Sequence, residues 1–170
     1  MPSFAVTVLG LDRPGIVAEV TEAIAVLGGN LEDSSMTLLR GHFAMTLIAE
    51  LSGPGEALAE RLADLSASGL VVSVLPVPAA TDTQSPTESF LLSVHGGDRP
   101  GIVSAITRRL ADLGGNITDL STRLTGGFYV LTAEVQLPAH RADEALAALR
   151  EAATELGVTV HLITVDEDVM

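Results

Sequence analysis

The sequence predicts an α+β fold that consists of two copies of one β-α-β-β-α-β unit. The first observation is a repeat: residues 12–17, Asp-Arg-Pro-Gly-Ile-Val, return unchanged at residues 98–103, and Leu-Gly-Gly-Asn at 27–30 returns at 113–116. The offset of 86 positions continues without a gap over residues 4–51 of the first copy. A repeat of this length is a whole structural unit and not a short motif. The second observation is that the period of the apolar residues changes in the same order within each copy.

Each copy begins with a predicted strand that leads through a turn into a helix. Residues 4–8 alternate between large apolar and smaller side chains, as in a half-buried strand. Apolar residues at 16–27 then recur at spacings of three and four, which places them on one side of a helix. Pro14 fits the first helical turn, and Gly28-Gly29 fits the helix end, where a positive φ is needed. The second copy has the same features 86 positions later.

The remainder of each copy predicts a hairpin, a second helix and a closing strand. The hairpin strands reverse at glycines, the second helix is rich in Ala and Leu, and a glycine precedes the closing strand. This order is the ferredoxin-like arrangement, in which two helices cover one face of a four-stranded antiparallel sheet. The predicted ranges are 31–40, 42–51, 56–66 and 70–77 in the first copy, and 117–125, 128–137, 142–156 and 158–165 in the second.

The domain boundaries follow from these elements. We expect a first domain at residues 1–78, a linker at 79–88 and a second domain at 89–170. The expected linker is rich in Pro, Ala, Thr and Ser and has no apolar period. The acidic residues 166–168 are expected to be frayed.

Composition argues against several classes of function. The chain of 170 residues is 47% hydrophobic and has a mean hydropathy of +0.42, which suits two small apolar cores. A net charge of −13 argues against direct binding of nucleic acid, whose phosphates require a basic surface. The chain has no Cys and every basic residue is Arg, so thiolate and lysine chemistry are excluded. The four histidines share no spacing, and we expect neither a metal nor a cofactor.

The same survey predicts a cytoplasmic protein without a membrane segment. Residues 1–11 have no basic residue ahead of their short apolar run, unlike a signal peptide. No apolar stretch reaches the roughly eighteen residues of a membrane-spanning helix.

The order of motifs resembles the ACT domain: an opening strand, Gly-x-Asp-Arg-Pro-Gly-Ile-Val, an amphipathic helix, then Gly-Gly-Asn and a hairpin. The resemblance extends from about residue 3 to residue 165 apart from the linker, and the tandem copies are similar to the glycine cleavage system transcriptional repressors. It implies that the protein senses an amino acid in a cleft between two units that lie side by side. In amino-acid-binding members, the ligand is held by the loop after the first strand of one unit, here residues 10–15 or 96–101, and by the Asn after the first helix of the partner.

Local chemistry supports the residues that the resemblance selects. A helix N-terminus presents free N–H groups and a partial positive charge, which suit an α-carboxylate. An Asp of the turn can face the ammonium group, and an Asn amide both donates and accepts hydrogen bonds. The candidate ligand-binding residues are Asp12, Gly15, Ile16, Val17 and Asn30 in the first copy, and Asp98, Gly101, Ile102, Val103 and Asn116 in the second.

Each candidate also has a purely structural interpretation. Asp12 and Asp98 either contact the ligand or cap the following helix, and the two roles are compatible. Asn30 and its counterpart either bind the ligand or serve as residues with a positive φ or at the entry to a strand. Arg13 and its counterpart are expected to be surface charges that lie against a helix end.

The turns depart from some ACT members in one respect. Those members carry a His two positions before the Asp, where this chain has Gly10 and Gly96. A smaller ligand, a bound water or no ligand fits this difference. Leu11 in the first turn corresponds to Gly97 in the second, which leaves open whether one cleft binds or both.

The sequence therefore predicts a non-enzymatic regulatory protein. As the resemblance implies, its ligand is a small amino acid of the glycine or serine class, and its partner is a protein, such as a transcription factor of glycine or one-carbon metabolism. The alternative is a ligand-free adaptor that only mediates protein contacts. Ala44, Ile48 and Val130, on the face expected opposite the helices, indicate further packing in a homo-oligomer.

Overall fold

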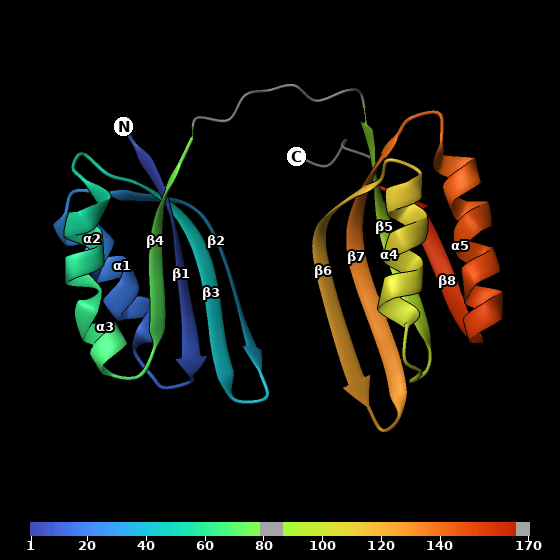
Figure 1. Ribbon diagram of the computed structural model, residues 1–170, viewed down its shortest axis with the longest axis horizontal. Coiled ribbons are helices and arrows are strands. Elements are labelled where there is room, and N and C mark those ends of the chain that lie inside the picture. Colours follow the sequence, from blue (N-terminus) through green and yellow to red (C-terminus); the bar gives the residue numbers. More distant parts are fainter. Residues whose placement is uncertain (79–86, 166–170) are drawn as a thin grey trace. The chain divides into compact units, whose positions relative to one another are not determined.

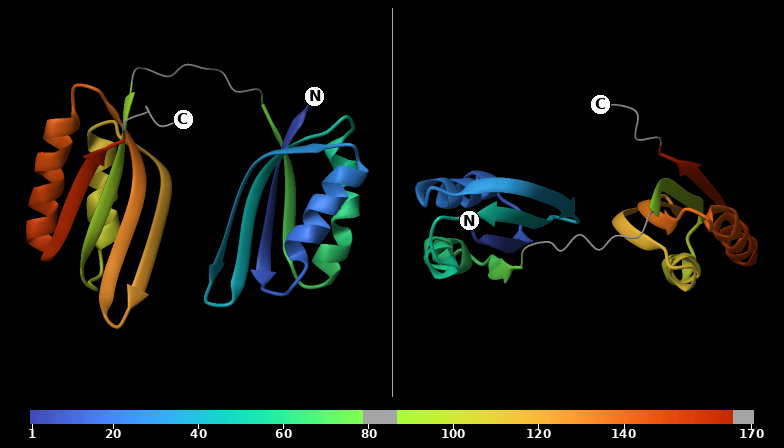
Figure 2. Two further views of the ribbon diagram at one scale, coloured as in Figure 1. Left: turned by 180° about the vertical axis from the view of Figure 1, so that it is seen from behind. Right: turned by 90° about the horizontal axis from the view of Figure 1, so that it is seen from above.

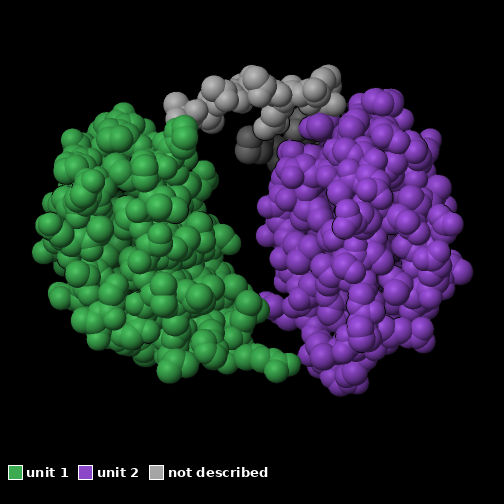
Figure 3. Space-filling model, in the orientation of Figure 1, with its two compact units in different colours: residues 1–81 green, residues 82–170 purple. Residues whose placement is uncertain are grey.

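The computed structural model describes residues 1–78 and 87–165, which form two compact units. Figure 3 colours the two units separately. Of the expected linker, only Thr87 and Glu88 lie within the described residues, and they begin a strand. The acidic residues 166–168 lie outside the described residues as well.

Each unit has the β-α-β-β-α-β order that the sequence predicts, with the second helix of the first unit divided in two (Figure 1). The elements of the first unit are β1 (Ser3–Leu11), α1 (Ile16–Val26), β2 (Asn30–Leu39), β3 (His42–Glu50), α2 (Gly55–Arg61), α3 (Ala63–Ala67) and β4 (Val71–Val77). The elements of the second unit are β5 (Thr87–Gly97), α4 (Ile102–Asp112), β6 (Asn116–Thr125), β7 (Phe128–Pro138), α5 (Ala142–Leu156) and β8 (Val158–Thr164).

The strands of each unit form one four-stranded antiparallel sheet. The strand order is β2-β3-β1-β4 in the first unit and β6-β7-β5-β8 in the second. Within each unit the helices lie together on one face of the sheet (Figure 2). The predicted ferredoxin-like α+β fold is therefore confirmed for both units.

Alternation along the strands separates the helix face of each sheet from the open face. Phe4, Val6 and Val8 of β1 are buried under the helices, whereas Thr7 and Leu9 are exposed on the other face. The helices contribute residues at spacings of three and four, as the period of the sequence predicts. Each unit thus encloses an apolar core of its own.

The residues expected opposite the helices lie there. In the first sheet, Ala44 pairs with Leu9 of β1, and Ile48 pairs with Ala5. In the second, Val130 pairs with His95. These positions alternate with the buried ones, so the face assignment is confirmed.

The second helix of the first unit differs from its prediction as one helix over residues 56–66. The helix α2 ends at Arg61 and α3 begins at Ala63, with the buried Leu62 between them at φ −87° and ψ −1°. Neither Gly nor Pro lies at this break, and nothing in the local sequence explains it. The corresponding helix of the second unit, α5, is continuous.

Candidate functional site

The turn between the first strand and the first helix has the same backbone shape in both units. Gly15 precedes α1 with φ 94° and ψ −10°, and Gly101 precedes α4 with φ 95° and ψ −4°. This left-handed conformation disfavours any residue with a Cβ atom, so the backbone requires glycine here. Pro14 lies in the turn before the helix and not in the first helical turn as predicted, because the left-handed glycine begins the helix.

Each turn is held by the hairpin of its own unit. The backbone N–H of Asp12 donates to the carbonyl oxygen of Gly41 at 3.0 Å, and that of Asp98 donates to Gly127 at 3.2 Å. Neither helix has a side-chain cap, because its capping position is occupied by glycine. The interpretation of Asp12 and Asp98 as helix caps is therefore wrong. Both aspartates are exposed.

The first turns of α1 and α4 leave backbone donors without a helical partner. The first helical hydrogen bond runs from the N–H of Glu19 to the carbonyl oxygen of Gly15, at 2.9 Å. The side chains of Ile16 and Ile102 belong to the core, so these residues offer a ligand only their backbone. Val17 is 43% exposed. The donors at these helix starts can receive an anionic group.

Gly10 and Gly96 belong to strands β1 and β5, and not to the loops as predicted. A Cβ atom at residue 10 would lie 2.6 Å from Cδ2 of Leu70, and one at residue 96 would lie 2.9 Å from Cγ1 of Val158. At residue 96 the close approach of β8 disfavours any residue with a Cβ atom, because the Cα atom of Val158 would lie 3.1 Å from it. At residue 96 packing against the backbone of Val158 therefore explains the absence of a His without reference to a ligand, whereas at residue 10 the closest atom belongs to a side chain that can move.

The start of β2, where Asn30 lies, is at the opposite end of its sheet from the turn between β1 and α1 (Figure 1). Asn30 pairs with Glu50, which pairs with Ser3 at the start of β1, whereas the turn follows Leu11 at the end of β1. At about 3.3 Å per residue, the length of β1 separates the two sites by about 26 Å. Asn116 has the same place in the second unit. No unit brings its own Asn and its own turn together.

Both asparagines are the first residues of strands, β2 and β6, and both are exposed. The positive φ lies two residues earlier, at Gly28 with 68° and Gly114 with 75°. Among the described residues, the only non-glycine with a positive φ is Arg40. The interpretation of Asn30 and Asn116 as residues with a positive φ is therefore wrong, whereas strand entry is correct.

The arginines of the turns lie against a helix end, as predicted. Nη2 of Arg13 donates to Oγ of Ser68, which follows α3, at 3.4 Å. The guanidinium of Arg99 lies over Gly157, which follows α5, with Cζ at 3.6 Å from the position of a Cβ atom there. A helix C-terminus favours such a positive charge.

Arg13 also pairs with Glu19, a partner that the sequence pattern did not predict. Nη1 and Nη2 of Arg13 donate to Oε1 and Oε2 of Glu19 at 2.5 and 2.8 Å. These hydrogen bonds raise the pKa of Arg13 and lower the pKa of Glu19 from their ordinary values. The two residues are six positions apart, which is not a helical spacing, so the rules for charge pairs on a helix do not find them.

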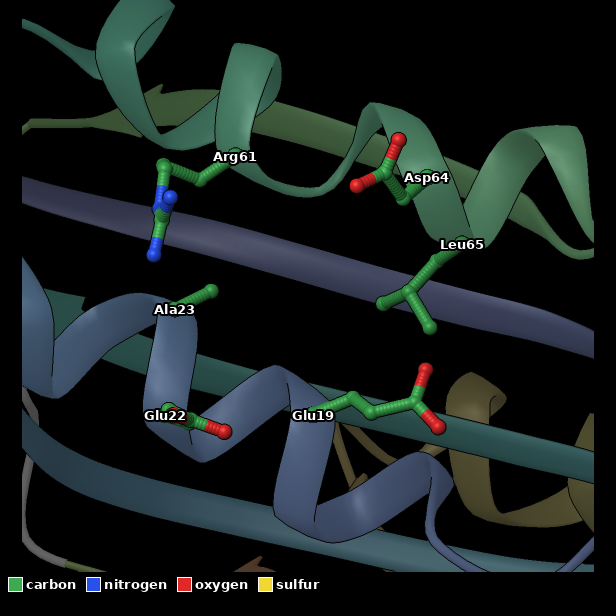
Figure 4. A pocket seen from close by; sticks show the side chains of 6 residues that line it. All are labelled: Glu19, Glu22, Ala23, Arg61, Asp64 and Leu65. Carbon is green, nitrogen blue, oxygen red and sulfur yellow. The ribbon is translucent and has the colours of Figure 1, made fainter.

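A groove of about 190 Å³ between α1 and the α2 and α3 helices is a further feature that the sequence did not predict (Figure 4). Carboxylates from both sides and one guanidinium surround it. The acidic residues are typical of solvated helix faces. The residues that line the groove are Glu19, Glu22 and Ala23 of α1, and Arg61, Asp64 and Leu65 of the facing helices.

Other chemical features of the described residues are few. No three His, Asp or Glu side chains within residues 1–78 and 87–165 are grouped to hold a metal ion. His95 and His161 stack on the open face of the second sheet, with 5.5 Å between ring centroids. No helix in the described part of the chain is long and apolar enough to cross a membrane.

Comparison with known proteins decides the family. The model of the ACT domain matches residues 3–70 and again residues 88–162. The chain belongs to the ACT-domain family. Each of its two ACT units contains one left-handed glycine turn and one asparagine at a strand entry.

Relatives of this tandem ACT chain include UPF0237 proteins and a transcriptional repressor. A UPF0237 protein of Methanopyrus kandleri is 39% identical over 69 residues, which cover 41% of this chain and 77% of that protein. The glycine cleavage system transcriptional repressor of Escherichia coli K12 is 30% identical over 148 residues, which cover 84% of this chain and 77% of the repressor. An unknown protein from Galdieria sulphuraria, whose crystal structure is known, is 31% identical in sequence. Its structure matches with a TM-score of 0.84 over 97% of this chain and 99% of that one. The ACT chain is thus homologous to the repressor over most of its length.

Proposed function

We propose that this protein is a non-enzymatic regulator that binds a small amino acid of the glycine or serine class through its glycine turns. The observation that carries the proposal is the pair of matched turns, in which an uncapped helix N-terminus lies next to an exposed aspartate. The free N–H groups suit the α-carboxylate, and Asp12 or Asp98 suits the ammonium group. A ligand with a small side chain can make both interactions and needs no further pocket to hold that side chain.

The ligand site is proposed to lie between two units. Because the length of β1, about 26 Å, separates Asn30 from the turn of its own unit, a site that uses both kinds of residue requires the turn of one unit and the Asn of another. As the resemblance to ACT domains implies, we infer that the turn that contains Asp12 shares a site with Asn116, and that the turn that contains Asp98 shares a site with Asn30.

The regulated partner is proposed to be a protein and not nucleic acid. The net charge of −13 opposes contact with phosphates. Homology to a glycine cleavage system transcriptional repressor supports a transcription factor of glycine or one-carbon metabolism as the partner. The absence of Cys and Lys from the sequence supports a non-enzymatic role, and we place this role in the cytoplasm.

A second candidate is an adaptor that has no ligand. The open face of the first sheet favours it, because this face exposes large apolar side chains that soluble monomers rarely group together. Leu9 is 51% exposed, Val71 is 68% exposed and Leu75 is 60% exposed, and the strand register places all three on that face. Contact of this face with a second copy would make the protein a homo-oligomer.

Thermal unfolding against a panel of the twenty amino acids separates the two candidates. A ligand that binds only the folded state, at about 100 times its Kd, adds roughly 2.7 kcal/mol to the free energy of unfolding. We expect glycine or serine to raise the Tm of the full chain. An unchanged Tm with every amino acid at millimolar concentration would contradict ligand binding and leave the adaptor.

Variants of the two asparagines test the proposed site itself. Asn30→Ala and Asn116→Ala, made separately, are expected to show which cleft is used through loss of the ligand-induced rise in Tm. Ser35→Ala, which changes an exposed residue of β2 outside the site, is the matched control. If both asparagine variants bind the ligand as well as the unchanged protein does, neither Asn30 nor Asn116 belongs to the site.

A further inference from the structure

The two turns have the same six residues but different surroundings. Residues 12–17 and 98–103 are identical, and their backbone angles agree at the left-handed glycine to within a few degrees. One difference lies one helical turn further along, where α1 carries Glu19 and α4 carries Ala105 at the corresponding position. This substitution places a carboxylate beside the first turn and none beside the second.

The carboxylate of Glu19 lies over the first turn. Its Oε1 atom is 3.3 Å from the position that a Cβ atom of Gly15 would occupy. Both of its oxygens accept hydrogen bonds from the guanidinium of Arg13, in the bidentate geometry that is the strongest form of this pair. The first turn therefore already has an acidic group in place, held by the arginine of the same turn.

This internal carboxylate has the chemistry of the proposed ligand's own carboxylate. The pair with Arg13 lowers the pKa of Glu19, so the group is negative at neutral pH. A second carboxylate that approached Gly15 would meet a like charge and would find the guanidinium of Arg13 occupied. Glu19 also compensates the partial positive charge of the α1 N-terminus, as an acidic residue of the first turn does.

The second turn lacks such an occupant. The position of a Cβ atom at Gly101 has no neighbouring atom within 4 Å, and the side chain of Ala105 carries no charge. Within the described residues, no salt bridge or side-chain hydrogen bond involves Arg99, whose guanidinium lies over Gly157. The donors of the α4 N-terminus and the Arg99 guanidinium thus meet no carboxylate of their own unit.

We propose that Glu19 is a built-in competitor that closes the first turn to carboxylate ligands, so that each chain binds one amino acid, at the second turn. The inference rests on the proposed function, because it assigns the ligand to one of the two turns. The pair of Arg13 and Glu19 is in this view an autoinhibitory contact. Ala105 is the residue that keeps the second turn open.

Isothermal titration calorimetry of the full chain with glycine and with serine tests the inference through the number of sites per chain. We expect one site in the unchanged protein and two in Glu19→Ala, in which the first turn loses its carboxylate. Ala105→Glu is expected to bind neither probe, because the new carboxylate lies one helical turn after Gly101, as Glu19 does after Gly15. Glu22→Ala removes an equal charge from α1 at a residue that lines the same groove but is not paired with Arg13, and it is expected to keep one site.

The outcomes separate this inference from the proposed function. Two sites in the unchanged protein, or one site in Glu19→Ala, would overturn the closure of the first turn while ligand binding stands. Full binding by Ala105→Glu would overturn the assignment to the second turn. If no variant binds either probe and the amino-acid panel leaves the Tm unchanged, the proposed function itself fails. A Tm measurement of each variant without ligand verifies that it is folded.

Discussion

Gly29 donates its backbone N–H to the carbonyl oxygen of Ile24 at 3.0 Å, and this hydrogen bond closes the end of α1 before β2 begins. Gly115 forms the same bond to Leu110 at 2.8 Å in the second unit. A bond from this position back across the last helical turn, with a left-handed Gly28 before it, is a Schellman motif. It explains the glycine at position 28, while close packing explains the second glycine, because a Cβ atom at residue 29 would lie 2.8 Å from the carbonyl oxygen of Glu50.

Gly29→Ala is expected to destabilise the first unit by about 1–3 kcal/mol. The new Cβ atom would lie 2.8 Å from the carbonyl oxygen of Glu50, a backbone atom that cannot move aside without disturbing β3. Urea unfolding measures the change. Gly53→Ala is the matched control, because no atom lies within 4 Å of its Cβ position and its φ is not positive. Equal stability of the two variants would contradict the packing argument.

Gly96→His is expected to destabilise the second unit by at least about 2 kcal/mol and to create no ligand site. The side chain would enter the space of Val158, where a Cβ atom already lies 3.1 Å from the Cα atom. Gly97→His, at the next residue, meets open space and is expected to fold normally. Thermal unfolding compares the two. A stable Gly96→His protein with tighter amino-acid binding would show that packing does not explain the glycine.

The pair of Arg13 and Glu19 is expected to make a stability contribution that depends on pH. Because the pKa of Glu19 is lower in the folded state, the contribution is fully present above the unfolded value, about 4.3, and is lost as the pH falls through the folded value. The Tm difference between the unchanged protein and Glu19→Gln should therefore be seen at pH 7 and disappear in acid. Since both side chains are exposed, it should also shrink in high salt. A difference that grows in acid would contradict this sign.

The asparagine variants are expected to have unequal effects. If Glu19 closes the first turn, ligand binding uses the turn with Asp98 and the Asn of the first unit. Asn30→Ala should then weaken binding, whereas Asn116→Ala should leave it unchanged. Calorimetry with glycine or serine measures both. The reverse pattern would mean that the first turn is the one in use.

The second helical segments are expected to differ in local stability. In the first unit this segment is divided at Leu62 into helices of 7 and 5 residues, whereas α5 has 15 residues without a break. Short helical pieces open more readily, because each must be nucleated separately. Hydrogen exchange followed by mass spectrometry should therefore show faster exchange in α2 and α3 than in α5. The equally long α1 and α4 provide the internal comparison, and equal protection of α2 and α5 would contradict the prediction.

Local patterns were sufficient to predict most of the fold. Burial on one face of a strand or helix leaves a pattern among residues that are close in the sequence. The alternation at Phe4, Val6 and Val8 and the helical spacing after Ile16 are such patterns. The internal repeat added a second, independent example of every element. The division of the helix at Leu62 was not predictable, since the residues on both sides are good helix formers and no turn residue marks it.

The candidate site was predictable only in part, because its geometry depends on contacts distant in the sequence. The repeated turn indicated Gly15 and Gly101, but the left-handed angle shifted the helix start past Pro14 and left Asp12 without a capping role. The separation of Asn30 from the turn follows from strand register, which spacing along the chain does not reveal. The sequence shows that Glu19 corresponds to Ala105. It does not show that the carboxylate of Glu19 lies over the turn, which only the structure reveals.

Covalent fusion of the two units has a consequence for symmetry. Two identical polypeptides that pair across a twofold axis must carry the same residue at both equivalent positions, so any change that shuts one pocket shuts the other. In this chain the equivalent positions are encoded separately, as Glu19 and Ala105. Each half can therefore vary separately, so that under the proposed function one turn can bind the ligand while the other does not.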